Sequence, residues 1–419
     1  MAGVTATLAQ WDALLQEDYV TGQIVEAINV ATPFKDELKR VGTTSGRERL
    51  YPVQVGASQG TGARAEGATM PAYGAGDYVD VAVRARYNYS PFKITGQSLE
   101  FGSKKAFVEF GLRILKDTKQ GLKLSIGRQC WGDGQGILAR TVTNPSVAGA
   151  TVITVDSAFG VLWGSFAANT TFLIKRNMLV QFGTEDNGGL GYTVTAVTGT
   201  TFTISPALVN NVATATAVTI KGSAGLEIVG AMQFAATAAF STTIGTSTTY
   251  NGVNRTNYPE WEGNVTNAGA ALSLVNIRAI RDTIYKRTDD EESNLMMGGT
   301  EMARDYEALL TPAQRFIPAT KLAAGIGQGK DSANGKNQLS HDGLDFSKDS
   351  RAPAKAMFFF DTQYIAWMET QGPNWLKDSS GIMRVVPGQD ALEALLRYYG
   401  NLDVEEPRRM AILFSITST

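Results

Sequence analysis

The chain has 419 residues, which allows about two to four domains at ~100–200 residues each. Its 43% hydrophobic and 19% charged residues are typical of a folded globular protein, and a net charge of −2 argues against a general nucleic-acid-binding surface. The single cysteine, Cys130, and the single histidine, His341, exclude a disulfide framework and metal sites built from several such residues, so the composition disfavours catalysis.

The first segment with a clear pattern is residues 8–30, where apolar residues such as Trp11 recur at helical spacing. A helix packed on its own domain and an arm that reaches a neighbouring subunit both fit this pattern. No basic region or long apolar run indicates export or membrane insertion near the start, so we expect a soluble protein made in the cytoplasm.

Residues 47–95 carry the strongest signal. Residues 77–95 alternate with period two, which predicts one long strand. One face would carry Val79, Val81, Val83 and Tyr87, and the other Asp80, Arg84 and Arg86, with Asp77 at the start. A shorter alternating segment, residues 51–55, precedes it, and the glycine-rich residues 56–76 lie between the two. Because an isolated ribbon cannot cover its own apolar face, we expect it to lie on another subunit, although a sheet within the same domain remains open.

A long helix is predicted over residues 103–131, followed by a glycine-rich stop. Residues 143–222 are rich in Thr, Val, Gly and Asn, and they contain six short alternating segments that predict a compact inserted β-domain. These segments are 151–155, 171–176, 178–182, 192–197, 201–205 and 215–221.

The remainder predicts a mixed α/β region. Helices are expected at residues 272–287 and 300–310, buried strands at 294–297 and 356–360, and a final strand at 410–416. Residues 325–343 read as a loose glycine-rich loop.

None of the candidate chemical motifs supports a named reaction. Residues 325–332 look like a phosphate-binding loop but lack its first glycine and its hydroxyl after the lysine. The carboxylates at 289–292 are typical of a solvated loop. We therefore assign no catalytic, cofactor-binding or metal-binding residue, and we expect a protein that is not an enzyme.

The order of the parts resembles the major capsid protein of tailed bacteriophages, whose shell fold is shared by herpesvirus capsid floors and encapsulins. Two local segments are also similar to that family: residues 250–256 followed by Trp261, and residues 398–402 followed by Glu406 and Pro407. The resemblance covers nearly the whole chain except residues 143–222, which look like the insertion domains of some members.

The resemblance implies an α+β fold with six parts. They are an N-terminal arm (1–46), an extended loop (47–95), a peripheral domain with a spine helix (96–142), the inserted β-domain (143–222), an axial domain (223–400) and a C-terminal strand that returns to the peripheral domain (401–419).

It also implies a function: self-assembly into pentamers and hexamers of an icosahedral head shell, located in the virion and assembled in the host bacterial cytoplasm. The implied partners are other copies of the chain, a portal, either a separate scaffolding protein or none, and packaged double-stranded DNA that is bound without sequence specificity. A decoration protein is left open, and no cofactor or membrane is implied. The candidate inter-subunit contacts are Val79, Val81, Val83, Arg84, Arg86, Tyr87, Asp77, Asp80 and Trp11.

Two other classes remain open. An encapsulin-type nanocompartment would share the fold and enclose an enzyme, and a β-rich ligand-binding or hydrolytic protein would account for the inserted domain. Family members that cross-link their shells use a lysine on the extended loop, and no lysine occurs here between Lys39 and Lys93. We therefore expect no such cross-link.

Overall fold

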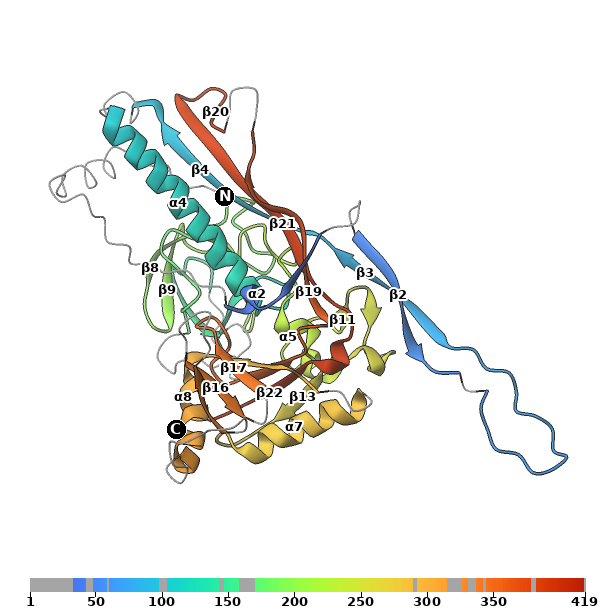
Figure 1. Cartoon of the computed structure of the whole chain (residues 1–419). Helices are drawn as coiled ribbons and strands as arrows, with labels where there is room; N and C mark the ends of the chain where they lie inside the picture. Colours follow the sequence, from blue (N-terminus) through green and yellow to red (C-terminus); the bar gives the residue numbers. More distant parts are fainter. Residues whose placement is uncertain are drawn as a thin grey trace.

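A computed structural model describes residues 33–42, 48–58, 60–97, 104–142, 147–157, 170–288, 292–314, 326–330, 337–341, 344–377 and 382–417 (Figure 1). The fold is a mixed α+β arrangement, rich in strands, with a long ribbon that leaves the body. In this part of the chain, none of the helices is long and apolar enough to cross a lipid bilayer.

A seven-stranded sheet forms one half of the body. Its order is β13 (Asn264–Asn267), β22 (Ala411–Phe414), β18 (Met357–Phe360), β14 (Leu295–Gly298), β17 (Leu344–Lys348), β16 (Asn337–His341) and β15 (Ile326–Lys330). All four residues of β18 are buried because side chains alternate between two covered faces. Met357 and Phe359 face a core that includes residues of two helices, α7 (Leu274–Arg287) and α8 (Thr300–Gln314).

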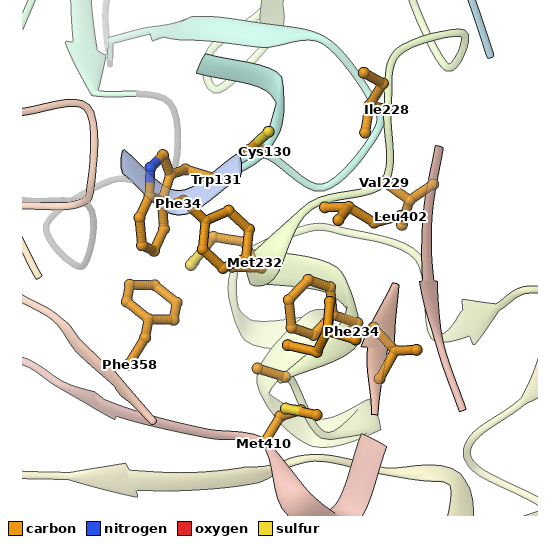
Figure 2. Close-up of a cluster of buried hydrophobic side chains, with 14 of the residues drawn as sticks. Phe34, Cys130, Trp131, Ile228, Val229, Met232, Phe234, Phe358, Leu402 and Met410 are labelled. Carbon is orange, nitrogen blue, oxygen red and sulfur yellow. The ribbon is translucent and has the colours of Figure 1, made fainter. Parts of the chain in front are cut away.

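The opposite face of β18, with Phe358 and Phe360, packs into the central core of the molecule. Figure 2 shows this cluster, in which the Trp131 ring lies 5.0 Å from the rings of both Phe34 and Phe358. The indole Nε1 of Trp131 donates a hydrogen bond of 3.0 Å to the buried carboxylate of Asp349. The end of the long helix is thus joined to the seven-stranded sheet.

A second sheet and the long helix form the other half. In this sheet, β21 (Ala391–Val404) pairs with β4 (Arg86–Thr95), β19 (Ile365–Trp375) and β20 (Arg384–Val385), and β1 (Lys39–Gly42) pairs with the other edge of β19. Helix α4 (Lys104–Gln129) packs on β4. At their contact, the side-chain amide of Gln129 donates a hydrogen bond of 2.8 Å to Asn88 Oδ1. The helix predicted at residues 103–131 is therefore confirmed.

Six strands close into a barrel in the order β10 (Ala217–Ile220), β5 (Ile137–Thr141), β6 (Val152–Ser157), β9 (Thr201–Ser205), β8 (Tyr192–Val197) and β7 (Leu179–Phe182). A separate apolar cluster fills its interior. Five of the six predicted segments are strands, but residues 171–176 are not. The sixth strand is β5, which lies before the predicted boundary at 143 and pairs with β10 because the barrel needs it to close.

Short elements connect these parts. They are α2 (Pro33–Asp36), α5 (Ala231–Phe234), α6 (Ala238–Thr243), the hairpin of β11 (Thr249–Tyr250) and β12 (Val253–Asn254), and two 3-10 helices, η2 (Pro259–Trp261) and η3 (Pro407–Arg409).

The single strand predicted at residues 77–95 is wrong, because the chain changes its pairing partner at Ala85. Strand β3 (Asp77–Arg84) pairs with β2 (Glu48–Gly56), whereas β4 pairs with β21 as far as Arg86 opposite Gly400. Beyond that point a side-chain contact replaces the strand pairing: the amide Nδ2 of Asn401 donates a hydrogen bond of 2.8 Å to the carbonyl oxygen of Arg84. The ribbon therefore begins where the sheet ends.

Three further expectations need correction. The region 325–343 contains strands β15 and β16, which the weak glycine-rich alternation did not reveal. Strand β22 does not return to the long helix, because it pairs with β13 and β18 inside the seven-stranded sheet. Strands β19 and β21 (residues 365–404) belong with α4 instead of with the region 223–400. The helix predicted at residues 8–30 lies outside the described residues.

Candidate functional site

The ribbon is the feature that distinguishes this body from an ordinary α+β protein. Within the part of the chain that the structure describes, strands β2 and β3 pair only with each other, from Glu48 opposite Arg84 to Gly56 opposite Asp77. They carry the tip far from the body (Figure 1). A two-stranded ribbon is marginally stable in water, so its base must be held by the body.

The foot of the ribbon is held by a buried carboxylate, Asp403 of β21. The Tyr51 hydroxyl donates 2.9 Å to Asp403 Oδ1, and Arg49 forms ion pairs with Asp403 and, at 3.0 Å, with Glu405. Burial raises the pKa of the Asp403 carboxyl, and the Tyr51 hydrogen bond and the Arg49 charge oppose that rise. These charge-assisted contacts join residues more than three hundred positions apart and fix the direction in which the ribbon leaves.

The tip, residues 57–76, ends in a tight turn. The Ala68 N–H donates 3.1 Å to the Ala65 carbonyl, and Gly67 has φ of 76°, a conformation that residues with a Cβ rarely adopt. The two limbs meet behind this turn, where a Cβ on Gly60 would lie 2.6 Å from the backbone nitrogen of Gly74. The glycines therefore allow the limbs to close into a narrow finger.

Large side chains on the ribbon remain in solvent. The side chains of Met70 and Tyr73 at the tip are 86% and 106% exposed, and Leu50 and Tyr78 on the strands are each 63% exposed. The charged residues of the tip are Arg64 and Glu66, one on each side of Ala65 in the turn. Such apolar exposure on a projecting element is typical of a contact surface.

A pocket of about 310 Å³ opens at the foot of the ribbon. Its lining comes from β3 and the β3–β4 junction, the loop between α4 and β5, α5 with the loop before it, the β11–β12 hairpin with the residues before it, and β21. It includes Arg84, Arg86, Asp133, Gln233 and Asn401. Five polar atoms of its lining residues are buried and have no hydrogen-bond partner among the described residues: Arg86 Nε, Asp133 Oδ2, Gln233 Oε1, Tyr250 Oη and Asn251 Nδ2.

Burial perturbs two of the three charged groups that line this pocket, Asp133 and Arg86. The Asp133 side chain is 5% exposed, and desolvation raises the pKa of its carboxyl to about 6. Burial, with a smaller effect of Arg84, lowers the pKa of Arg86, and no carboxylate among the described residues raises it. Arg86 donates 3.0 Å to the Gly225 carbonyl but has no counter-ion in the described chain.

No protein-family model matches the sequence, and no curated protein has a matching sequence. Solved structures do match over nearly the whole chain. The capsid asymmetric unit of cyanophage A-1(L) matches with a TM-score of 0.58 at 12% identity, over 97% of this chain and 99% of that one. This chain has the phage major capsid fold.

Two other structures are similar over comparable lengths. The capsid of a native GTA particle matches with a TM-score of 0.49 at 11% identity, over 98% of this chain and 99% of that chain. The encapsulin SrpI complex from Synechococcus elongatus matches with a TM-score of 0.43 at 8% identity, over 97% of this chain and 95% of that chain.

Within the capsid fold, the predicted contact residues fall into two groups. Val81 and Val83 are fully buried in the core of their own chain, with Val79 packed partly against it. The prediction that a neighbouring subunit buries Val81 and Val83 is therefore wrong, because they anchor the foot of the ribbon instead.

The remaining candidates lie nearer to solvent. Asp77 and Asp80 are exposed, and Arg84 forms a 2.9 Å cross-strand ion pair with Glu48. Tyr87, 49% exposed, packs edge-on against Tyr399 with ring centroids 5.0 Å apart. Arg86 lines the pocket described above, and Trp11 lies outside the described residues. Their role in subunit contacts stays a prediction.

The segment 250–256 has a structural role that the sequence did not reveal. All five guanidinium N–H groups of Arg255, a side chain 1% exposed, are directed at acceptors. Nε donates to Thr248 O, Nη1 to Gln233 O and Ala236 O, and Nη2 to Ser241 Oγ and Ser247 O, at 2.7–3.1 Å. Desolvation lowers the pKa of Arg255 to about 10. Arg255 thus ties α5, α6 and the β11–β12 hairpin together beside the pocket.

Sequence reasoning also missed Asp403 and Asn401, which hold the ribbon. The sequence indicates only that the segment around them is similar to a pattern of the capsid family. A signal was present, because a buried strand seldom carries an unpaired Asp and Asn, but nothing local indicated that their partners lie near residues 49–84.

Proposed function

We propose that this chain is the major capsid protein of a tailed double-stranded DNA bacteriophage and that its copies assemble into the hexamers and pentamers of an icosahedral head shell. The observation that carries this proposal is the solvent-exposed ribbon on a body with the phage capsid fold. A shell subunit needs an element that reaches beyond its own body, since each copy must contact several neighbours.

The parts of the fold support distinct roles in this proposal. The extended loop would be the β2–β3 ribbon, and the peripheral domain would combine α4 as the spine helix with β4, β19 and β21. The axial domain would be the seven-stranded sheet with α7 and α8, and the barrel would be an inserted domain on the shell surface. Residues 1–46 would supply the N-terminal arm.

The partners follow from the same proposal. The chain would contact other copies of itself, a portal, a separate scaffolding protein and packaged DNA without sequence specificity, in the virion after assembly in the host cytoplasm. A decoration protein would dock on the barrel if one is used. The near-neutral charge suits a container, because a strongly basic wall would bind the genome. No reaction is assigned to the chain.

The test is the size of the expressed protein, by sedimentation velocity and negative-stain electron microscopy. Closed shells, or rings of five or six subunits, support the proposal, whereas a stable monomer whose melting temperature rises with a small ligand would point to a binding protein or hydrolase. Particles from the natural source separate the remaining alternative: double-stranded DNA inside supports a phage head, and an enzyme cargo without DNA would establish an encapsulin-type compartment.

A further inference from the structure

The pocket at the foot of the ribbon contains a cation, Arg86, and a carboxylate, Asp133, each with a buried polar atom that has no hydrogen-bond partner among the described residues; the charge of Arg140 also acts on Asp133. Arg86 has a buried Nε without an acceptor and no counter-ion among the described residues. Asp133 uses Oδ1 to accept 2.9 Å from the Gln135 N–H, while its buried Oδ2 accepts nothing in the described chain. Buried polar atoms are normally paired, so this pocket is suited to an incoming group that carries both an anion and a cation.

The apex of the ribbon carries such a pair. Arg64 and Glu66 flank Ala65 in the terminal turn, both are exposed, and neither forms an ion pair within the described residues. The contacts of Arg64 are with the Thr69 and Ala63 carbonyls, at 3.2 and 3.3 Å. The narrow, glycine-lined limbs behind the turn would let it enter a confined space.

The reach of the ribbon decides whose pocket the apex can enter. About nine strand residues and ten tip residues extend it up to ~60 Å from its own foot, at ~3.3 Å per residue. A compact body of this size has a radius of gyration of about 21 Å, which corresponds to a sphere about 55 Å across. The apex therefore cannot return to its own pocket, but its reach is comparable to the width of one body, which is the spacing expected between equivalent pockets of adjacent copies.

We propose that the apex turn of one subunit inserts into the foot pocket of the next, with Glu66 paired to Arg86 and Arg64 paired to Asp133. This inference rests on the proposed shell function and specifies which surfaces meet. The contact is head-to-tail, so repetition around a rotation axis closes a ring of the kind that a capsomer needs.

Cysteine cross-linking tests this contact directly, because the native Cys130 is buried and 1% exposed. The pair Ala65→Cys and Thr249→Cys places one thiol in the turn and one at the exposed rim of the pocket, and it leaves all four charges intact. We expect oxidised particles to give a ladder of dimers and higher multimers on non-reducing denaturing gels. The control pair, Ala65→Cys with the exposed Val385→Cys, should remain monomeric.

The outcomes separate the two levels of the proposal. Normal shells without the Ala65–Thr249 ladder would overturn the docking and leave the shell function standing. Absence of shells or rings from the unaltered protein would contradict the shell function itself. A ladder that also forms with Val385→Cys would mean non-specific collision and would likewise overturn the docking.

Charge reversal gives an independent measurement. Glu66→Arg places a like charge against Arg86, and we expect the concentration for half-maximal assembly to rise on the order of tenfold or more. The matched control is Asp282→Arg on the exposed face of α7, which makes the same charge change and should assemble like the unaltered chain. Equal assembly of Glu66→Arg and the unaltered chain would refute the pairing.

Discussion

At the scale of single residues, Arg255 shows why one side chain type is needed at one place. Its planar group serves five acceptors from three separate segments, and a lysine ammonium is a compact group with three donors. We predict that Arg255→Lys lowers the stability of the folded chain by about 3 kcal/mol, because buried carbonyl groups lose their donors. Thermal unfolding followed by circular dichroism measures this.

The control for that substitution is Arg278→Lys, on the exposed face of α7. It should leave the unfolding temperature nearly unchanged, since exposed substitutions seldom exceed ~0.5 kcal/mol. Equal unfolding temperatures for the Arg255 and Arg278 variants would mean that the network around Arg255 adds little.

Asp133 predicts a specific dependence of stability on pH in the unassembled subunit. Its carboxyl has a pKa of about 6 in the folded chain and the ordinary 3.8 when unfolded. Between these values the folded chain holds a proton that the unfolded chain has lost, so stability falls as the pH rises through this window. Above about pH 6 the carboxylate is charged in both states, and its burial lowers the free energy of unfolding by about 3 kcal/mol, at roughly 1.4 kcal/mol per pKa unit.

The substitution Asp133→Asn keeps an acceptor for the Gln135 N–H and removes the charge. We expect the variant to gain stability relative to the unaltered chain at pH 8 and to lose this part of the slope between pH 4 and pH 6, as measured by melting temperature. Asp282→Asn, an exposed carboxyl, serves as the control. Parallel melting profiles of Asp133→Asn and the unaltered chain would refute the assignment.

At the scale of elements, the ribbon divides into a foot that serves the fold and a tip that does not. Arg49 and Tyr51 hold the foot, whereas the hydrogen bonds that the structure describes for residues 60–76 join tip residues to one another. Replacing residues 57–76 by a two-residue Asn-Gly turn should therefore keep the melting temperature of the subunit but abolish closed shells.

Negative-stain microscopy beside a melting curve gives both readouts for the shortened ribbon. A tip variant that still forms shells in normal yield would show that the tip is not an assembly element. As a control, a flexible tip of the original length, made of Gly and Ser, tests whether length alone is sufficient.

The barrel provides a second prediction about elements, because its ends lie together. A Cβ on Gly136 would lie 3.1 Å from the carbonyl oxygen of Ser223. Replacing residues 137–222 by a short Gly/Ser linker should leave the rest of the chain folded. Replacing only residues 143–222 should cause aggregation, because β5 keeps Leu138 and Ala139 without the barrel interior that buries them. Solubility and melting curves of the two deletions distinguish these outcomes, and equal behaviour would contradict the boundary.

At the scale of the whole molecule, what the sequence could predict depended on the range of the interactions. Helix α4 and five barrel strands follow from local periodicity and turns, which neighbouring residues determine. The break at Ala85 could not be predicted in this way, because it depends on where the pairing of β4 with β21 ends, at Gly400, more than three hundred residues later. The role of Asp403 could not be predicted either, because its partners Arg49 and Tyr51 lie more than three hundred residues earlier. The foot pocket is assembled from five separate segments. Its charged residues carry no local pattern that differs from a solvated surface.

The last prediction concerns how an assembled shell holds together. A covalent link of the kind used by cross-linking capsids needs an amine on the extended loop, and no lysine lies between Lys39 and Lys93. Lys93 itself is on β4, hydrogen-bonded to Gln389 and paired inside its own sheet, so it cannot reach along the ribbon. The arginines of the ribbon cannot replace it, because a guanidinium stays protonated. We therefore expect mature particles boiled in detergent and reductant to give one band near the 44.9 kDa chain mass. A ladder that survives this treatment would show that another residue supplies the link.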